Sequence, residues 1–156
     1  MSCFGGSFFS LPGVRCDRFD GLAGDGSTEA AQQFFLSHCH SDHMVGLDTL
    51  GAFLRKRNQN RGVEYPRKPY CSVISSVFVQ KKYPGIPSDA IVELLPNHPK
   101  TVTMSDTWEV YSLRVTAVQS NHCPGSLMFM FEKLDSDGAV SKRILYTGDF
   151  RFDNPA

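Results

Sequence analysis

Residues 33–43, QFFLSHCHSDH, are an apolar run that ends abruptly in histidine and aspartate. Four apolar or β-prone residues followed by a polar cluster predict a buried strand that ends at a loop. Side chains alternate along an extended backbone, so His38 and His40 should share one face while Cys39 points to the other. Asp42 and His43 add two donors where the chain turns into the next element, for which helical leucine spacing predicts a helix over roughly residues 43–57.

This cluster has the chemistry of a metal site, because imidazole nitrogens and carboxylate oxygens are good zinc ligands. Four of the five histidines of the chain lie in it or at His122. One such histidine alone would be an ordinary surface or structural residue, but this concentration of a rare residue favours metal binding. His122 lies in a turn between two expected strands, and Asp149 follows another in TGDFR, where a carboxylate could bridge two metals.

The rest of the chain predicts a mixed α/β domain. A short extended segment should end near residues 16–17, followed by a flexible loop at 21–28. Residues 70–72 should form a short strand, with Ser72 capping a helix over about 73–82. A turn is expected at 135–138. The strands expected in the last third of the chain are residues 113–118, 127–131 and 143–146.

Composition places the chain among ordinary globular proteins. It has 156 residues, 41% of them hydrophobic, with 16 basic and 16 acidic residues, so one domain with a real core is expected. The zero net charge gives no sign of a nucleic-acid partner. Five scattered cysteines without a C-x-x-C pair favour a reducing intracellular compartment. The first residues lack the features of a signal peptide, and the longest apolar run, 127–131, is too short to span a membrane.

Several motifs together resemble a known family. The H-x-H-x-D-H cluster, the later turn histidine and the later T-G-D are similar to motifs two, three and four of the metallo-β-lactamase fold. The stretches FFLSHCHSDHMVGL, NHCPGSLMFMF and ILYTGDFR resemble, more narrowly, the DNA cross-link repair nucleases of the β-CASP group. RCDRFD at residues 15–20 is most similar to the Artemis branch. The similarity covers nearly the whole chain and is weaker between residues 51 and 101.

The resemblance implies a metallo-β-lactamase αββα sandwich. Residues 1–156 would be the N-terminal half of that domain, an incomplete domain from which the β-CASP insertion and the C-terminal half are absent. A further ligand to the second zinc would belong to the absent part. The resemblance also implies ligands for one or two zinc ions, or other divalent metals: His38, His40 and His122 for the first, Asp42 and His43 for the second, and Asp149 bridging both.

Further roles follow from the same resemblance. Asp42 and Asp149 would be the catalytic residues, and Asp17 would steady the histidine loop from outside the ligand shell. The implied activity is metal-dependent hydrolysis of DNA phosphodiesters, by 5′–3′ exonuclease or structure-selective endonuclease cleavage. The implied setting is double-strand-break end joining and interstrand cross-link repair in the nucleus. Damaged or broken DNA ends and other repair proteins would be the partners, with no membrane involved.

Two alternatives stay open: a non-catalytic, truncated metal-binding fragment and a small-molecule hydrolase of the same fold. HCPGS and TGDFR count against the second. The basic residues of 55–68 could contact DNA phosphates, but a solvated loop is the favoured interpretation. Cys39 and Cys123 are expected to pack and not to bind zinc, and His98 to be an exposed loop residue. Trp108 and the Phe and Met residues of 127–131 are expected in the core.

Overall fold

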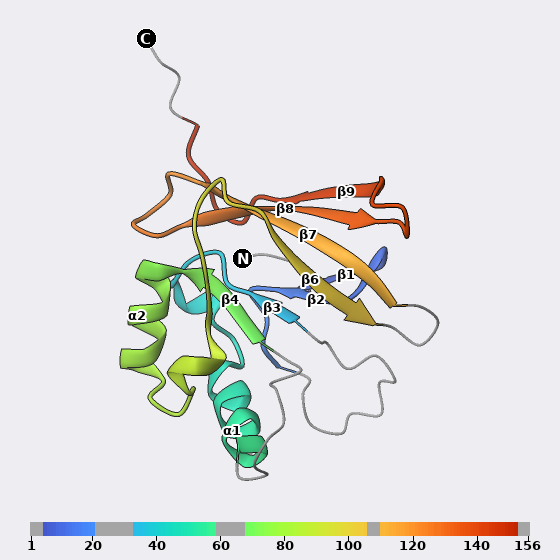
Figure 1. Ribbon diagram of the computed structural model, residues 1–156. Coiled ribbons are helices and arrows are strands. Elements are labelled where there is room, and N and C mark those ends of the chain that lie inside the picture. Colours follow the sequence, from blue (N-terminus) through green and yellow to red (C-terminus); the bar gives the residue numbers. More distant parts are fainter. Residues whose placement is uncertain (1–4, 21–32, 59–67, 106–109, 153–156) are drawn as a thin grey trace.

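The computed structural model describes residues 5–20, 33–58, 68–105 and 110–152 (Figure 1). Within them, two sheets lie face to face. The first sheet has five strands in the order β1-β2-β3-β4-β5, parallel except for the pair β1–β2. Its strands are β1 (Ser7–Phe8), β2 (Leu11–Cys16), β3 (Gln33–Phe35), β4 (Lys68–Ser72) and β5 (Val92–Leu94).

The second sheet is an antiparallel meander in the order β6-β7-β8-β9. Its strands are β6 (Lys100–Ser105), β7 (Val110–Gln119), β8 (Leu127–Leu134) and β9 (Val140–Tyr146). Helices α1 (Leu47–Asn58) and α2 (Val73–Lys82) lie on the side of the first sheet away from the second (Figure 1). Two single turns of 3-10 helix complete the described elements, η1 (Ser41–His43) and η2 (Ser88–Ala90).

Strand β3 is central because both of its faces are buried, as is usual for parallel strands covered on two sides. Phe35 packs between the sheets against Tyr70 and Phe129. Phe34 points the other way, into the cluster that holds the leucines of α1. The chain leaves β3 after Phe35 and enters the histidine segment directly, so the packing of this strand fixes where that segment begins.

Most expected elements are confirmed, with small shifts at their ends. The extended segment ending near residue 16, the strands at 33–36 and 70–72 and the three strands of the last third are all present. The turn at 135–138 is closed by a 2.9 Å bond from the Gly138 N–H to the Asp135 carbonyl. Strands β1, β5 and β6 were not predicted as such, because each is short or lies among prolines and small polar residues.

The predicted start of the first helix was wrong by four residues. Residues 41–43 form the separate turn η1, and α1 begins at Leu47. Gly46 separates them with φ +88°, a conformation that side chains disfavour. A Cβ there would lie 2.3 Å from the Asp20 nitrogen, so only glycine fits where residue 46 packs against the backbone of Asp20.

The core prediction for β8 holds for one face only. Leu127, Phe129 and Phe131 are buried between the sheets, whereas Met128 and Met130 are half-buried on the outer face. Period-two alternation explains the difference. Trp108 and the loop at 21–28 lie outside the described residues. In the part of the chain that is described, no helix is long and apolar enough to cross a membrane.

Ser72 is the predicted N-cap of α2, and the structure confirms it. Its hydroxyl accepts a 3.0 Å hydrogen bond from the Ser75 N–H. We expect Ser72→Ala to lower the free energy of unfolding by about 0.5–2 kcal/mol, because a helix N–H loses its partner. Urea denaturation measures this. Ser141→Ala, at an exposed serine of β9, is the control and should change stability by less than about 0.5 kcal/mol. Equal effects of the two substitutions would contradict the prediction.

Candidate metal centre

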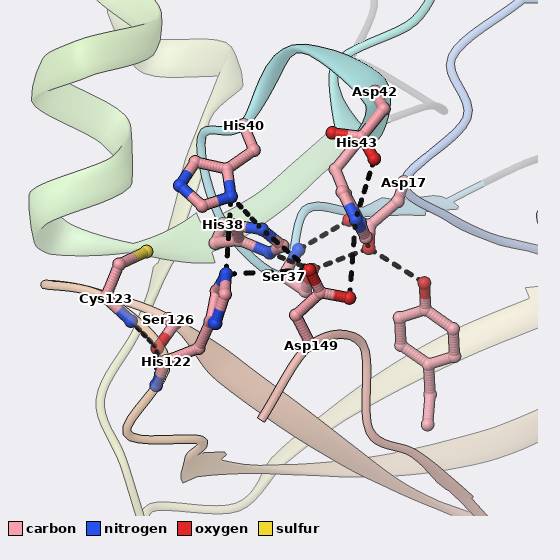
Figure 2. Close-up of polar contacts among 11 residues, drawn as sticks. Asp17, Ser37, His38, His40, Asp42, His43, His122, Cys123, Ser126 and Asp149 are labelled. Carbon is pink, nitrogen blue, oxygen red and sulfur yellow. Dashed lines mark hydrogen bonds and ion pairs between the residues drawn. The ribbon is translucent and has the colours of Figure 1, made fainter. Parts of the chain in front are cut away.

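The predicted ligands come together where the ends of the two sheets meet (Figure 2). His38 and His40 lie in the segment between β3 and η1, His122 lies in the turn between β7 and β8, and Asp149 follows β9. Each offers a ligand atom, and these four atoms all lie within 4.8 Å of one another. Residues up to 111 positions apart therefore form one cluster of donors.

The spacing of these donor atoms fits a tetrahedral metal ion. His40 Nδ1 lies 3.0 Å from His38 Nε2 and 3.3 Å from His122 Nε2. Asp149 Oδ2 lies 3.5 Å from His122 Nε2 and 3.8 Å from His38 Nε2. Ligands bonded to zinc at about 2.0–2.1 Å in a tetrahedron are separated by roughly 3.3–3.4 Å. Three imidazole nitrogens and one carboxylate oxygen are also the donor types that zinc prefers.

A second set of donors lies beside the first. His43 Nε2 is 3.7 Å from Asp42 Oδ2 and 3.7 Å from Asp149 Oδ1. Asp149 thus turns one oxygen toward the three histidines and the other toward His43 and Asp42. This is the arrangement of a carboxylate able to bridge two ions.

The structure places Asp17 in direct contact with His43, beside the cluster. Asp17 is 4% exposed and adopts the left-handed conformation, with φ 56°. Its Oδ2 contacts His43 Nδ1 at 2.7 Å, and its Oδ1 accepts the Ser37 N–H at 2.7 Å. Sequence reasoning missed Ser37 and Tyr146, whose hydroxyls donate to Asp17 Oδ2 at 2.5 and 2.8 Å. Only their positions directly before His38 and before the TGD turn could have drawn attention to them.

The surroundings give the histidines different proton affinities. Burial, with a smaller effect of His43, lowers the pKa of His38 to about 4, so its imidazole is neutral at neutral pH. A metal ligand must be in this form. For His43, the hydrogen bond to Asp17 raises the pKa. A metal at its Nε2 would have to displace a proton when His43 is charged.

The turn at residues 120–126 holds His122 in place through its own hydrogen bonds. Ser126 Oγ accepts the N–H groups of His122 at 3.2 Å and Cys123 at 3.1 Å. Gly125 has φ +81°, and a Cβ on it would lie 2.8 Å from Ser72 Oγ, at the start of α2. The Pro-Gly pair thus lets the turn pack closely against the first sheet.

The other candidates lie apart from the donor cluster. Cys39 Sγ points to the Ser75 carbonyl at 3.7 Å and packs on the helix side, as expected. Cys123 is half-buried and is absent from the four-residue donor cluster found in the described residues. His98 is an exposed loop residue whose Nδ1 contacts the Pro96 carbonyl, as expected. Most of the basic stretch at 55–68 lies outside the described side chains, so its DNA contact stays untested.

Comparison with known proteins identifies relatives along nearly the whole chain. No family model matches it. Protein artemis of Gallus gallus is 37% identical over 155 residues, which are 97% of this chain and 19% of that protein. The DNA cross-link repair protein PSO2/SNM1 of Saccharomyces cerevisiae is 35% identical over 129 residues, 80% of this chain and 17% of that protein. The 5′ exonuclease Apollo of Rattus norvegicus is 34% identical over 122 residues, 78% of this chain and 18% of that protein.

These matches show which proteins the chain resembles and how much of each of them it covers. The chain spans about a fifth of the length of the curated relatives it matches. The resemblance seen in the motifs is confirmed, because these relatives are 34–37% identical to the chain over 78–97% of its length. Over most of its length the chain is therefore similar to Artemis, PSO2/SNM1 and Apollo, which are metallo-β-lactamase/β-CASP nucleases.

Proposed function

We propose that this chain provides the metal-binding site of a zinc-dependent DNA nuclease. The observation that supports it most is the shared carboxylate Asp149, which faces three histidines through one oxygen and a second donor pair through the other. We assign the first ion to His38, His40 and His122. We assign the second to Asp42 and His43, with Asp149 common to both.

The fold that we propose is the metallo-β-lactamase sandwich. Two facing sheets with α1 and α2 on one outer side correspond to three of the four layers of an αββα arrangement (Figure 1). In this fold the donors gather along one rim, at the ends of strands, where loops can bring ligands from both sheets. We assign the whole described part of the chain to this one domain.

The exposure of the donors leaves room for a substrate. His38 has a fully buried side chain, whereas the side chains of Asp149 and Asp42 are 49% and 65% exposed. The buried histidine anchors the site, and the two aspartates face the side from which a phosphodiester would approach. A divalent metal pair held here would supply an acidified water and offset the charge that develops on a phosphodiester.

The names of the relatives favour DNA as the substrate. They include a DNA cross-link repair protein and a 5′ exonuclease. We therefore propose hydrolysis of phosphodiesters at DNA ends, by 5′–3′ exonuclease or structure-selective endonuclease action. The corresponding setting is double-strand-break end joining and interstrand cross-link repair in the nucleus, with DNA and other repair proteins as partners.

Cleavage of end-labelled DNA by the purified 156-residue chain tests this function. We expect Zn²⁺-dependent release of nucleotides from a 5′-phosphorylated single strand, abolished by a chelator and by His122→Ala. His98→Ala removes a histidine outside the cluster and should cleave as the unmodified chain does. Tight metal binding without cleavage would favour a non-catalytic metal-binding role. Hydrolysis of thioesters or β-lactams in place of DNA would favour a small-molecule hydrolase.

A further inference from the structure

A buried hydrogen-bond network lies directly behind the two sets of metal donors. We define it as the Asp17 network: Asp17, Ser37 and Tyr146. Figure 2 shows the Asp17 carboxylate beside Ser37 and His43. The hydroxyl of Tyr146, at the end of β9 in the second sheet, also donates to it. The carboxylate accepts four hydrogen bonds, one on Oδ1 and three on Oδ2. The carboxylate contacts His43, a proposed ligand of the second metal, directly. Through Ser37 it is connected to His38, a proposed ligand of the first.

The direction of the Ser37 hydroxyl proton determines which ring nitrogen of His38 is protonated. Ser37 Oγ lies 2.5 Å from Asp17 Oδ2 and 2.9 Å from His38 Nδ1. A carboxylate can only accept, so the single hydroxyl proton must point to Asp17. Ser37 Oγ can then only accept from His38, which therefore carries its proton on Nδ1. The lone pair of neutral His38 is thus left on Nε2, the atom that faces His40 and Asp149.

Asp17 imposes the same tautomer on His43. Its Oδ2 lies 2.7 Å from His43 Nδ1, so that nitrogen donates and the lone pair of neutral His43 belongs to Nε2. This Nε2 faces Asp42 and Asp149. One carboxylate oxygen therefore orients a ligand of the second proposed metal directly and a ligand of the first through Ser37.

Tyr146 ties this arrangement to the second sheet. Burial raises the pKa of its hydroxyl, which keeps the group protonated and able to donate to Asp17. Tyr146 ends β9, three residues before Asp149. Between them, Gly148 adopts φ +52°, and a Cβ there would lie 2.9 Å from Ser37 Oγ. The segment that follows β9 and carries Asp149 is thus in close contact with Ser37.

We propose that Ser37 and Tyr146 are positioning residues that act through Asp17 to present Nε2 of His38 and His43 to the metals. The two metal positions are coupled in consequence, because one carboxylate orients a ligand of each. This inference rests on the proposed function for the metals themselves. The histidine tautomers, however, exist without any metal, so the two ideas can be tested apart.

The first test uses the metal-free chain with ¹⁵N-labelled histidine. Long-range ¹⁵N–¹H correlation spectra at about pH 9, above the usual histidine pKa of ~6.5, report which ring nitrogen carries the proton. We expect His38 and His43 both to be protonated on Nδ1. Ser37→Ala should give His38 a mixture of tautomers, and Tyr146→Phe should shift the His43 signals. Unchanged tautomers in Ser37→Ala would overturn the proposal.

Matched controls separate positioning from simple loss of stability. Ser76→Ala removes another buried hydroxyl that is hydrogen-bonded, to the Val73 carbonyl and to Glu93. Tyr111→Phe removes a tyrosine hydroxyl that donates to the Pro12 carbonyl at 3.0 Å. Neither residue belongs to the metal cluster or to the Asp17 network. Both control variants should keep the histidine tautomers of the unmodified chain, even where they unfold more easily.

The second test titrates Zn²⁺ against a chromophoric chelator. We expect Ser37→Ala to weaken binding by about 10–100-fold, the usual effect of losing an outer-shell partner, and to weaken both ions and not the first alone. Tyr146→Phe should weaken binding by about 10-fold, and the controls by less than about twofold. Equal affinities in Ser37→Ala and Ser76→Ala would overturn the proposal. If the unmodified chain bound no metal while its tautomers responded as expected, the positioning would stand and the proposed function would fail.

Discussion

Replacing Asp149 with asparagine is expected to abolish binding of the second metal and to weaken binding of the first by at least about 100-fold. Changing an outer-shell partner already costs about 10–100-fold in affinity, and Asp149 is proposed as a direct ligand of both ions. An amide keeps the shape of the side chain but offers one neutral oxygen, so it cannot bridge two ions as a carboxylate does. DNA cleavage should fall by at least the same factor.

Metal stoichiometry and affinity, measured by competition with a chelator, check this prediction. Asp149 is half-exposed and its described contacts are with histidines, so the fold should not change. Asp89→Asn, at an exposed residue of η2, removes the same charge away from the cluster and should bind two ions as before. If Asp149→Asn still bound two ions with undiminished affinity, the bridging assignment would be wrong.

Local signals in the sequence marked several of the residues that the structure brings into the cluster. Alternation along a strand places His38 and His40 together, and an apolar run of four residues marks the buried strand before them. Apolar or β-prone runs also located parts of β7, β8 and β9, at residues 113–118, 127–131 and 143–146. The same runs placed His122 and Asp149 at strand ends, which is where the structure has them.

What the sequence could not predict depends on contacts between distant residues. Tyr146 donates to Asp17 across 129 positions, and Ser37 reaches it across 20. Nothing in the local pattern distinguishes these hydroxyls from ordinary turn residues. The start of α1 was wrong for a similar reason, since Gly46 passes against the backbone of Asp20 in a distant loop. Such positions are set by tertiary packing, which overrides local propensity.

Truncating Phe35 to alanine is expected to lower the free energy of unfolding by about 3–5 kcal/mol. Its side chain is fully buried and lies 4.8 Å from the Tyr70 ring and 4.9 Å from the Phe131 ring, between centroids. Removing the ring loses its burial and leaves a cavity where the two sheets meet. A loss of this size is a large part of the total stability of a typical domain.

Urea denaturation of Phe35→Ala and Phe152→Ala measures the effect against a matched control. Phe152 is 83% exposed, so its truncation should change stability by less than about 0.5 kcal/mol. A loss below about 1 kcal/mol for Phe35 would mean that the second sheet does not pack on β3 as described. Because His38 follows Phe35 by three residues while His122 and Asp149 come from the second sheet, loosening this contact should also weaken Zn²⁺ binding. The same aromatic contact that holds the sheets together therefore sets the distance between the donors.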